Sequence, residues 1–421
     1  MPVVVRPPAP SPESLTLHAP ASKSETLRGL VAATLAGGGT LTHVATPWPA
    51  DVHAVIAALK ALGAEIDVEE DVIRVIAGLE STGEPVTISA GDGAAPARFL
   101  LALAATTGRP VTITGEGRLP ERPMGPLLAA LRSLGARVDG GPGLPVTVQG
   151  PLQGGRRLGV DGRASSQFVS ALLLVAPAVP GGLALRSVGR QVSRPYIDLT
   201  RDVMAAFGAG SDGGLDALTD QTYVAGRTYA VGADWSGATA LLAAAPLLGR
   251  PVFVPSLRTS SVQPDRAFAE VLTAIGVDVV ARDGGLLASG SVDAGGTFDL
   301  GEFPDSAPAL AALAAAGSHE VRIEGAAHLR HKESDRIAAL VALLEGVGLE
   351  AEELRDGLRI MGGPLARAQG PPVRLPVRGD HRIAMTAALL GLRRPVLIDD
   401  ETCVAKSFPA FFDQWPGVVD A

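Results

Sequence analysis

The chain repeats one pattern of elements six times, with a period of roughly 70 residues. Each repeat holds a polar turn, a helix rich in Ala and Leu, a short strand, a second helix that ends near a glycine, and a pair of strands. The first helices of the repeats are expected to begin near Ser22, Gly91, Ser165, Ser236, Asp305 and Asp380. This order predicts an α/β protein of six βαβαββ-like repeats, and the glycines fit left-handed helix caps.

The repeats divide into three plus three, with the join near residues 226–234. At 421 residues the chain is long enough for two domains of about 200 residues each. We therefore expect one domain over residues 22–233 and a discontinuous one over residues 1–21 plus 234–421. A strand expected at residues 14–18 precedes the first repeat and can complete the discontinuous domain. Residues 1–20 lack the apolar segment of a signal peptide, and their prolines predict a frayed tail.

Composition argues against several classes of partner. Aromatic residues make up 4% of the chain and its net charge is −8, which disfavours nucleic acid and anionic membranes as partners. No unbroken apolar run approaches the roughly 20 residues of a membrane span. Cys403 is the single cysteine, so no internal disulfide can form and a reducing compartment is favoured. We expect a cytoplasmic monomer whose partners are small molecules.

Lysine is rare and is concentrated in polar stretches. Of the 36 basic residues four are lysines, and Lys60 alone lies on an ordinary amphipathic segment. The others are Lys23 in PASKSETLR, Lys332 in HLRHKESDR and Lys406 in CVAKSFP. Arg supplies most of the positive charges in this chain. A Lys at these positions therefore indicates that a compact ammonium group is needed, either to bind phosphate or to exchange a proton. The alternative is three solvated surface lysines.

Polar side chains cluster where the first helices begin. Taken singly, Ser22, Asp305 and Asp380 are explained as N-caps. Capping does not explain Lys23 and Arg382, because the helix dipole disfavours cations at an N-terminus. Such cations need a negative partner, and a bound anion is the simplest one. The helix starts therefore predict a site for a ligand with several anionic groups.

The segment HKESDRIAALVALL concentrates charge at another helix start. Lys332 and Arg336 are four residues apart and are expected on one face of this helix, with Glu333 beside them and Asp335 orienting Arg336. Alone, the segment would indicate a surface ion-pair cluster; together with GDHRIAM and CVAKSFP it favours a functional site. His381 is expected to have a structural or orienting role. The sequence shows no His/Cys/Asp spacing typical of a metal site.

These segments, taken together, resemble the family of enolpyruvylshikimate-phosphate synthases. The resemblance runs in order along the chain through PASKSETLR, GRASSQFVSALL, SRPYIDLT, FPDSAPALAALA, LRHKESDRIAAL, RGDHRIAM and AKSFPAFF. It implies two globular domains, each of three βαβαββ repeats in an inside-out α/β barrel, with a cleft between them. It also implies transfer of the enolpyruvyl group of phosphoenolpyruvate to the 5-hydroxyl of shikimate 3-phosphate, with release of phosphate, in the shikimate pathway of aromatic amino acid biosynthesis. No cofactor and no metal is implied.

The resemblance assigns roles to individual residues. The implied catalytic residues are Lys23, Asp305 as proton acceptor from the hydroxyl, and Glu333 as proton donor to the enol carbon. The implied shikimate 3-phosphate ligands are polar: Lys23, Ser24, Arg28, Ser165, Ser166, Gln167, Ser193, Tyr196, Asp305, His328 and Lys332. The implied phosphoenolpyruvate ligands are mostly cationic: Lys23, Ala94, Arg122, Gln167, Arg336, Arg382 and Lys406. One base and one acid suit addition to an enol, and several cations offset the charges of two phosphorylated substrates.

The chain departs from the family pattern in the loop GDGAAPARF. Asp92, Ala94 and Ala95 stand where the family usually has Asn, Gly and Thr, and His328 stands where an Asn is usual. Glyphosate, the inhibitor known for the family, occupies the phosphoenolpyruvate subsite. Ala94 in place of Gly therefore predicts that the chain tolerates glyphosate.

Two other interpretations stay open. One is the sister transferase that acts on UDP-N-acetylglucosamine, although the Lys-Asn pair usual there is replaced by Lys23-Ser24 and its loop Cys is missing from GEGRLPERP. The other is a diverged paralogue that binds a shikimate-like ligand without turnover. The altered GDGAAPARF loop motivates the second interpretation.

Overall fold

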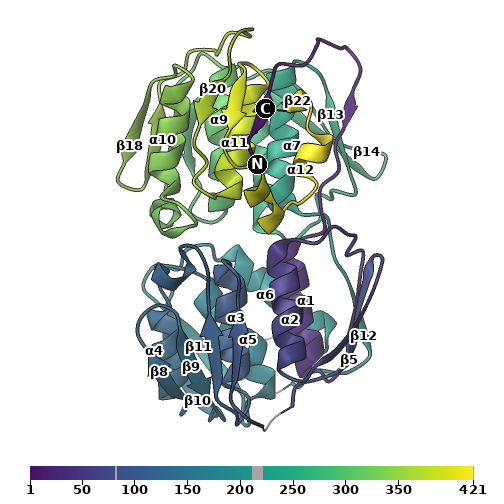
Figure 1. Cartoon of the computed structure of the whole chain (residues 1–421), viewed down its shortest axis with the longest axis vertical. Helices are drawn as coiled ribbons and strands as arrows, with labels where there is room; N and C mark the ends of the chain where they lie inside the picture. Colours follow the sequence, from purple (N-terminus) through teal and green to yellow (C-terminus); the bar gives the residue numbers. More distant parts are fainter. Residues whose placement is uncertain (81–82, 211–220, 421) are drawn as a thin grey trace. The chain divides into compact units, whose positions relative to one another are not determined.

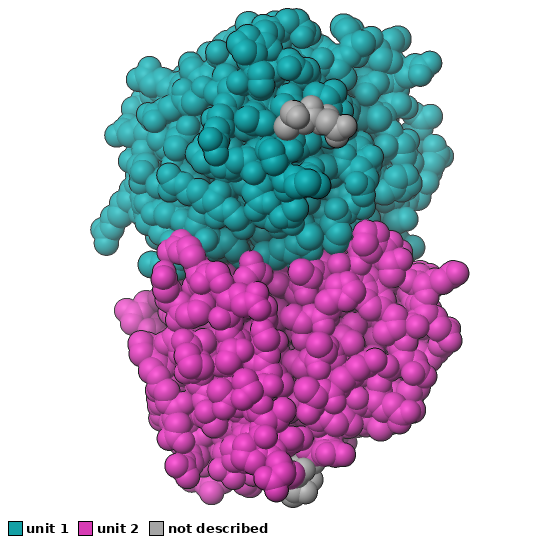
Figure 2. Space-filling model, in the orientation of Figure 1, with its two compact units in different colours: residues 1–20, 233–421 teal, residues 21–232 magenta. Residues whose placement is uncertain are grey.

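The computed structural model describes residues 1–80, 83–210 and 221–420 of the chain. Two compact units divide the chain, unit 1 over Met1–Pro20 and Ala233–Ala421 and unit 2 over Ala21–Gly232 (Figure 2). These limits lie one residue from the domain limits expected from the sequence. That each unit is an independently folding domain stays a prediction.

The described part of unit 2 contains three sheets and the helices that pack against them (Figure 1). Its sheets have the strand orders β12-β3-β5-β4, β6-β7-β9-β8 and β10-β11. The strands are β3 (Gly39–Thr42), β4 (Glu65–Glu69), β5 (Val72–Ala77), β6 (Val86–Ser89), β7 (Val111–Thr114), β8 (Arg137–Gly140), β9 (Val146–Gln149), β10 (Arg156–Asp161), β11 (Leu183–Val188) and β12 (Arg227–Ala230). The helices are α1 (Lys23–Leu35), α2 (Ala50–Ala61), α3 (Ala94–Ala104), η1 (Leu119–Glu121), α4 (Gly125–Ser133), α5 (Gln167–Val175), η2 (Ala176–Ala178) and α6 (Pro195–Ala206).

Unit 1 has the same kind of organisation. Its sheets have the strand orders β14-β15-β13-β2, β16-β17-β19-β18 and β20-β21-β1-β22. The strands are β1 (Val3–Val5), β2 (Leu15–Thr16), β13 (Val252–Pro255), β14 (Val277–Arg282), β15 (Gly285–Gly290), β16 (Gly296–Asp299), β17 (Val321–Glu324), β18 (Ala351–Leu354), β19 (Gly357–Ile360), β20 (Val373–Leu375), β21 (Val396–Ile398) and β22 (Val418–Asp420). The helices are α7 (Trp235–Leu248), η3 (Pro264–Ala267), α8 (Phe268–Ala274), η4 (Pro304–Ser306), α9 (Ala307–Leu313), η5 (Ala314–Ala316), η6 (Ala327–His331), α10 (Arg336–Gly346), α11 (His381–Gly391), η7 (Thr402–Lys406) and α12 (Phe411–Gln414).

Each four-stranded sheet contains one parallel pair and two antiparallel pairs in the same order. In the sheet of the first repeat, for example, β12 runs parallel to β3, and β5 is antiparallel to both β3 and β4. The six predicted first helices begin at or close to the expected residues. The strand pair that the pattern predicts after α6 falls partly on residues 211–220, outside the described residues.

The prediction of a frayed tail over residues 1–20 is wrong. Val3, Val4 and Val5 are buried and form β1, which pairs antiparallel with β21 on one side and β22 on the other. The expected strand near residues 14–18 is confirmed, because β2 pairs parallel with β13 in unit 1. The partners of β1 lie almost a whole chain length away, so no local pattern marks this short apolar run as a strand.

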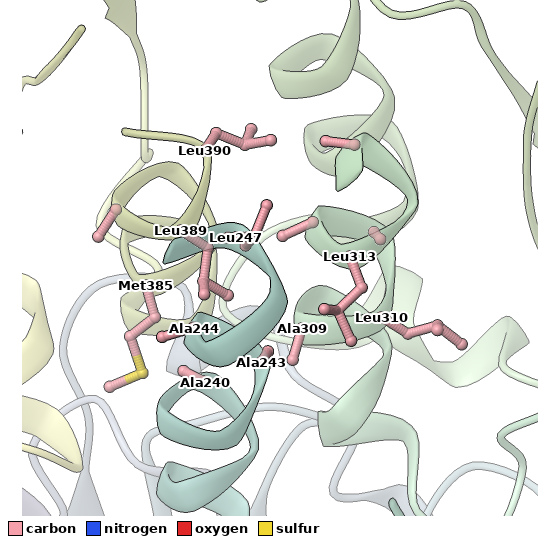
Figure 3. Close-up of a cluster of buried hydrophobic side chains, with 14 of the residues drawn as sticks. Ala240, Ala243, Ala244, Leu247, Ala309, Leu310, Leu313, Met385, Leu389 and Leu390 are labelled. Atoms are coloured by element: carbon pink, nitrogen blue, oxygen red, sulfur yellow. The ribbon is translucent and has the colours of Figure 1, made fainter. Parts of the chain in front are cut away.

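Three nearly enclosed helices form the centre of each unit. In unit 1 they are α7, α9 and α11, and every residue of these three helices is buried. Ala240, Ala243 and Ala244 of α7 pack against residues of α9 and α11 (Figure 3). In unit 2 the corresponding helices are α1, α3 and α5, which contact one another. Small side chains permit the close approach of the helix axes, which is why the core is rich in Ala and poor in aromatic residues.

Glycines end the outer helices as the repeat pattern predicts. Gly63, Gly135, Gly208, Gly276 and Gly348 follow α2, α4, α6, α8 and α10, with φ of +97°, +94°, +88°, +99° and +89°. A side chain is strained in this left-handed region, so glycine is the residue that lets the chain turn back from the helix. Within the described residues, no helix has the length and apolar character needed to cross a membrane.

Candidate active site

Asp305 lies at the centre of a charge cluster in unit 1. It belongs to η4, directly before the inner helix α9. Its Oδ1 accepts hydrogen bonds from Lys332 Nζ at 3.0 Å and from Arg336 Nη1 at 2.8 Å. Burial raises the pKa of the Asp305 carboxyl, but Lys332, Arg336 and Arg382 outweigh burial and hold this pKa well below its usual value. Asp305 is therefore ionised at neutral pH, as a proton acceptor must be.

Arg336 links Asp305 to two further carboxylates. Its guanidinium is 2% exposed and donates from Nη2 to Glu333 Oε2 at 2.9 Å. It also donates to both oxygens of Asp380, from Nε at 2.9 Å and from Nη2 at 3.2 Å. Asp380 is fully buried, accepts a hydrogen bond from Ser334 Oγ at 2.9 Å, and caps α11 by accepting from the N–H of Arg382. One carboxylate thus holds the starts of α10 and α11 together.

Glu333 lies between two cations. Its Oε1 is 3.0 Å from Lys406 Nζ, and its Oε2 accepts from Arg336. Lys406 ends η7 and is 5% exposed. Lys332, Asp305, Arg336, Glu333 and Lys406 therefore form a continuous line of alternating charge, to which three separate stretches of the sequence contribute. The two residues expected to act as base and acid share one guanidinium.

The prediction that Lys332 and Arg336 lie on one helical face is wrong. Helix α10 begins at Arg336, whereas Lys332 precedes the helix with extended backbone angles of φ −86° and ψ −159°. Both cations nevertheless reach the same oxygen of Asp305. The extended backbone, rather than helical spacing, brings them together.

The expectation that Asp335 orients Arg336 is also wrong. Asp335 caps α10 by accepting from the N–H of Ala338 at 3.2 Å, and it pairs with Arg330 at 3.0 Å. A capping side chain turns back toward its own helix backbone and so points away from the next side chain. Asp380, which lies 44 residues after Arg336, makes the bidentate contact with Arg336 instead.

The remaining expected residues of unit 1, Arg382 and His328, are buried. Arg382 is buried in the first turn of α11 and donates to both the backbone oxygen and the Oγ of Ser236 on α7. His328 is buried in η6, and His381 is buried with Nδ1 3.8 Å from Asp380 Oδ1. A small pocket reaches Asp305 and Arg382 between the inner helices α7, α9 and α11.

In unit 2, Lys23 begins α1, and Ser22 caps this helix as expected. Lys23 Nζ donates to Oδ2 of Asp51 on α2 at 2.8 Å. A cation at a helix start predicts a bound anion as its simplest partner. Here, as in unit 1, a carboxylate of the chain itself is a partner.

Arg28 contacts two other expected residues of unit 2, Ser24 and Tyr196. It is 2% exposed and donates from Nη1 to the backbone oxygen of Ser24 at 2.8 Å and from Nε to Thr200 Oγ1 at 2.8 Å. Its guanidinium lies 5.8 Å from the centre of the Tyr196 ring and 3.4 Å from the Tyr196 backbone oxygen. Burial lowers the pKa of Arg28 to about 10, which still leaves the group charged at neutral pH. Arg28 thereby fixes the start of α1 against α6.

Arg98 of α3 organises the turn before α5. It donates from Nη1 to Ser165 Oγ at 3.1 Å and to Gln167 Oε1 at 2.7 Å. It also donates from Nη2 to the backbone oxygen of Pro123 at 2.8 Å, next to Arg122. Ser166, which lies between Ser165 and Gln167 in the sequence, is buried. Arg98, which is not among the residues expected from the sequence, thus joins two of the expected ligand segments.

Three further expected residues of unit 2 are buried. Ser193 has φ of +50°, a left-handed conformation that residues other than glycine rarely adopt and that is frequent at binding sites. Arg122 is 8% exposed and follows η1. Ala94 begins α3, and its side chain belongs to the hydrophobic core of unit 2.

Sequence reasoning missed Asp51, Arg98, Ser236 and the contact of Asp380 with Arg336. Each lies at or near a predicted helix start, where Asp and Ser are ordinary caps. The informative signal was the large number of polar residues at these helix starts. It located the candidate site, but it did not show which polar side chains contact one another. Within the described residues, no group of three or more His, Cys, Asp or Glu is arranged to hold a metal ion.

Solved structures define the class of fold. The chain is similar over its whole length to an EPSP synthase from Acinetobacter baumannii, with a TM-score of 0.79, 23% identity and 100% coverage of both chains. The fold is therefore the enolpyruvyl transferase fold, with helices at the centre of each unit and sheets around them.

Sequence relatives define the family. The family model for EPSP synthase (3-phosphoshikimate 1-carboxyvinyltransferase) matches residues 9–415. The chain is 38% identical to the 3-phosphoshikimate 1-carboxyvinyltransferase of Methanoculleus marisnigri, over 98% of both chains. It is 39% identical to that of Thermococcus kodakarensis, over 94% of this chain and 95% of the relative. The chain belongs to the EPSP synthase family.

Proposed function

We propose that the chain transfers the 1-carboxyvinyl group of phosphoenolpyruvate to the 5-hydroxyl of shikimate 3-phosphate and releases phosphate. The observation that carries the proposal is the line of alternating charge in unit 1, in which Asp305 and Glu333 contact the same guanidinium of Arg336. Family membership supplies the substrates, because the relatives matched along the chain are named for this reaction.

Asp305 and Glu333 act as base and acid in an addition followed by an elimination. In the addition, Asp305 takes the proton of the 5-hydroxyl, the hydroxyl oxygen bonds to C2 of phosphoenolpyruvate, and Glu333 protonates C3. In the elimination, Glu333 takes a proton back from the new methyl group, the double bond re-forms, the bond from C2 to the phosphate oxygen breaks, and Asp305 gives its proton to the leaving phosphate. Each carboxyl group is then back in its starting protonation state, as general acid–base catalysis requires.

The contacts of Asp305 set a condition on its role as base. Its low pKa makes it ionised but a weak proton acceptor. Lys332 and Arg336 both donate to Asp305, and both are expected to contact a substrate anion. When a substrate phosphate or carboxylate binds Lys332 and Arg336, these cations interact less strongly with Asp305, and the pKa of Asp305 rises. Substrate binding therefore activates the base.

The cations offset the charge of two substrates that each carry a phosphate and a carboxylate. We assign Lys332 in unit 1, with Arg28 and the residues held by Arg98 in unit 2, to shikimate 3-phosphate. We assign Arg336, Arg382 and Lys406 in unit 1 to phosphoenolpyruvate. The remaining expected residues keep the assignments that the family resemblance gives them. Hydrogen-bond donors that are already oriented by the protein stabilise developing charge without reorganisation cost.

The test is release of inorganic phosphate by the purified chain with phosphoenolpyruvate and shikimate 3-phosphate. Omission of either substrate is the control, and replacement of shikimate 3-phosphate by UDP-N-acetylglucosamine tests the sister activity. We expect phosphate only with shikimate 3-phosphate present. Binding of shikimate 3-phosphate without any phosphate release would instead support the diverged paralogue.

We also infer that the protein is a cytoplasmic monomer, from its single cysteine and its net charge of −8. Size-exclusion chromatography with light scattering tests the oligomeric state.

A further inference from the structure

The ion pair of Lys23 with Asp51 has no role in the scheme above. Asp51 lies in the first turn of α2 and is 3% exposed, and the Lys23 side chain is 19% exposed. Their charged atoms are 2.8 Å apart. In the described part of unit 2, this is the one ion pair that Lys23 makes. The expected substrate-binding ammonium is therefore held by a nearly buried carboxylate.

The position of both residues favours a fixed pair. Lys23 is the first residue of α1, where the helix dipole disfavours a cation, and Asp51 lies in the first turn of α2, where the dipole favours an anion. A carboxylate this deeply buried is costly unless it is paired. Asp51 therefore compensates the unfavourable place of Lys23, and Lys23 supplies the partner that buried Asp51 needs.

Gly93 leaves room for the Asp51 carboxylate. It precedes the first residue of α3 and has φ of −88° and ψ of 120°, which any residue can adopt. A Cβ at Gly93 would lie 2.4 Å from Asp51 Oδ1 and 2.8 Å from both Asp51 Cγ and Pro96 Cγ, far inside normal contact distance. The backbone does not require glycine here; the Asp51 carboxylate is the nearest obstacle to a side chain, and Pro96 is the next. Asp51 is thus confined between Lys23 on one side and the start of α3 on the other.

We propose that Asp51 is a positioning residue that holds the Lys23 ammonium in place for substrate, and that Gly93 is a glycine because the Asp51 carboxylate occupies the space of a side chain. The proposal rests on the proposed function, in which Lys23 contacts both substrates. Asp51 itself touches neither substrate and acts through Lys23.

Chemical labelling tests the pair without using activity. The chain has four lysines, and Lys60 on α2 is exposed, so it serves as the internal reference. Acetylation by N-hydroxysuccinimidyl acetate is followed for each lysine by peptide mass spectrometry. We expect the rate at Lys23, relative to Lys60, to rise about tenfold or more in Asp51→Asn, because a charge-assisted hydrogen bond is lost. Gly93→Ala should have the same effect, because its methyl displaces the carboxylate.

Kinetics separate positioning from a purely structural role. Both variants should lower kcat by about 10- to 100-fold, the usual effect of a misplaced group. The KM for phosphoenolpyruvate should stay level or fall in Asp51→Asn, which removes a negative charge, and should rise in Gly93→Ala, which keeps that charge but displaces it. Gly141→Ala is the matched control in unit 2, because a Cβ there meets nothing within 4 Å. It should change neither the labelling nor the kinetics.

Parent-like labelling of Lys23 in both variants, with kcat unchanged, would overturn the proposal. If Asp51→Asn does not fold, Gly93→Ala decides by the same two measurements. If the parent releases no phosphate, the proposed function fails, while the labelling still shows whether Asp51 holds Lys23. A lowered melting temperature with unchanged relative labelling means that Asp51 has a structural role only, which also overturns the proposal.

Discussion

Replacing Asp380 by Asn should destabilise unit 1 far more than the same change at Asp335. Both residues are N-caps of helices in unit 1, Asp380 for α11 and Asp335 for α10. Asn caps a helix about as well as Asp, so the capping contribution is nearly unchanged in both variants. The difference between them is the partner: Asp380 is fully buried against Arg336, whereas Asp335 is 37% exposed beside Arg330.

The magnitude follows from what each variant loses. Removing one partner of a buried ion pair costs about 3–5 kcal/mol, because a charge is left poorly compensated. Arg336 keeps its bonds to Asp305 and Glu333, so we expect the lower end, about 3 kcal/mol. The exposed pair of Asp335 contributes about 0–1 kcal/mol. For a domain of this size, about 3 kcal/mol corresponds to a melting temperature about 6–12 °C lower.

Urea unfolding of the full chain, followed by tryptophan fluorescence, measures the difference. Trp235 and Trp415 are buried in unit 1 and Trp48 in unit 2, so the signal comes mainly from unit 1. The variant Trp48→Phe, used as the background for both changes, limits the signal to unit 1. Equal losses of unfolding free energy in Asp380→Asn and Asp335→Asn would refute the reasoning, since the buried contact with Arg336 would then contribute nothing beyond the cap.

Three further outcomes are expected. Asp305→Ala and Glu333→Ala should each reduce phosphate release about 100-fold or more, the scale of a general acid or base, and near-normal turnover in either variant would remove that residue from the mechanism. Because cations depress the pKa of folded Asp305, its ionised form stabilises the fold above the ordinary value of 3.8, and this contribution is lost as the pH falls below that value. The excess stability of the parent over Asp305→Asn, measured by urea unfolding, should therefore stay level from about pH 7 to about pH 5 and shrink as the pH falls below about 4, and a difference that stays constant down to about pH 2 would contradict the assignment. Ala94→Gly should increase inhibition by glyphosate about 10- to 200-fold if the methyl narrows the subsite; unchanged inhibition would mean that Ala94 only packs in the core of unit 2.

The helices could be predicted from the sequence because their signals are local. Ser22 and Asp380 cap the helices that they were expected to begin, and Gly63 and its equivalents end the outer helices. β1 could not be predicted, because Val3–Val5 is a short run before several prolines and its two partners lie at residues 396–398 and 418–420. Its strand conformation is set by those distant partners rather than by its own sequence.

In the candidate site, the sequence likewise predicts the individual charged residues better than the ion pairs that they form. The cations Lys23, Arg336 and Lys406 were selected by residue type, and each contacts a carboxylate. Neighbours in sequence suggested the wrong carboxylate for Arg336, since Asp335 faces its own helix while Asp380 arrives from another repeat. Which carboxylate pairs with which cation depends on how the helix starts are arranged inside a unit. No local spacing in a single sequence reveals this arrangement.

The pairing of β1 has a consequence for synthesis of the chain. Unit 2 is continuous from residue 21 to residue 232, so its segments can assemble while the rest of unit 1 is still being made. β1 must wait for residues 396–420, which at about 5–20 residues per second takes about 20–80 s. An apolar strand with open edges is an aggregation hazard during that time. Arg6, Pro7 and Pro8 directly follow β1, and a charge next to prolines is the kind of flank that discourages another strand from adding to it. The segment of residues 6–8 thus discourages β1 from pairing with other strands until β21 and β22 have been synthesised.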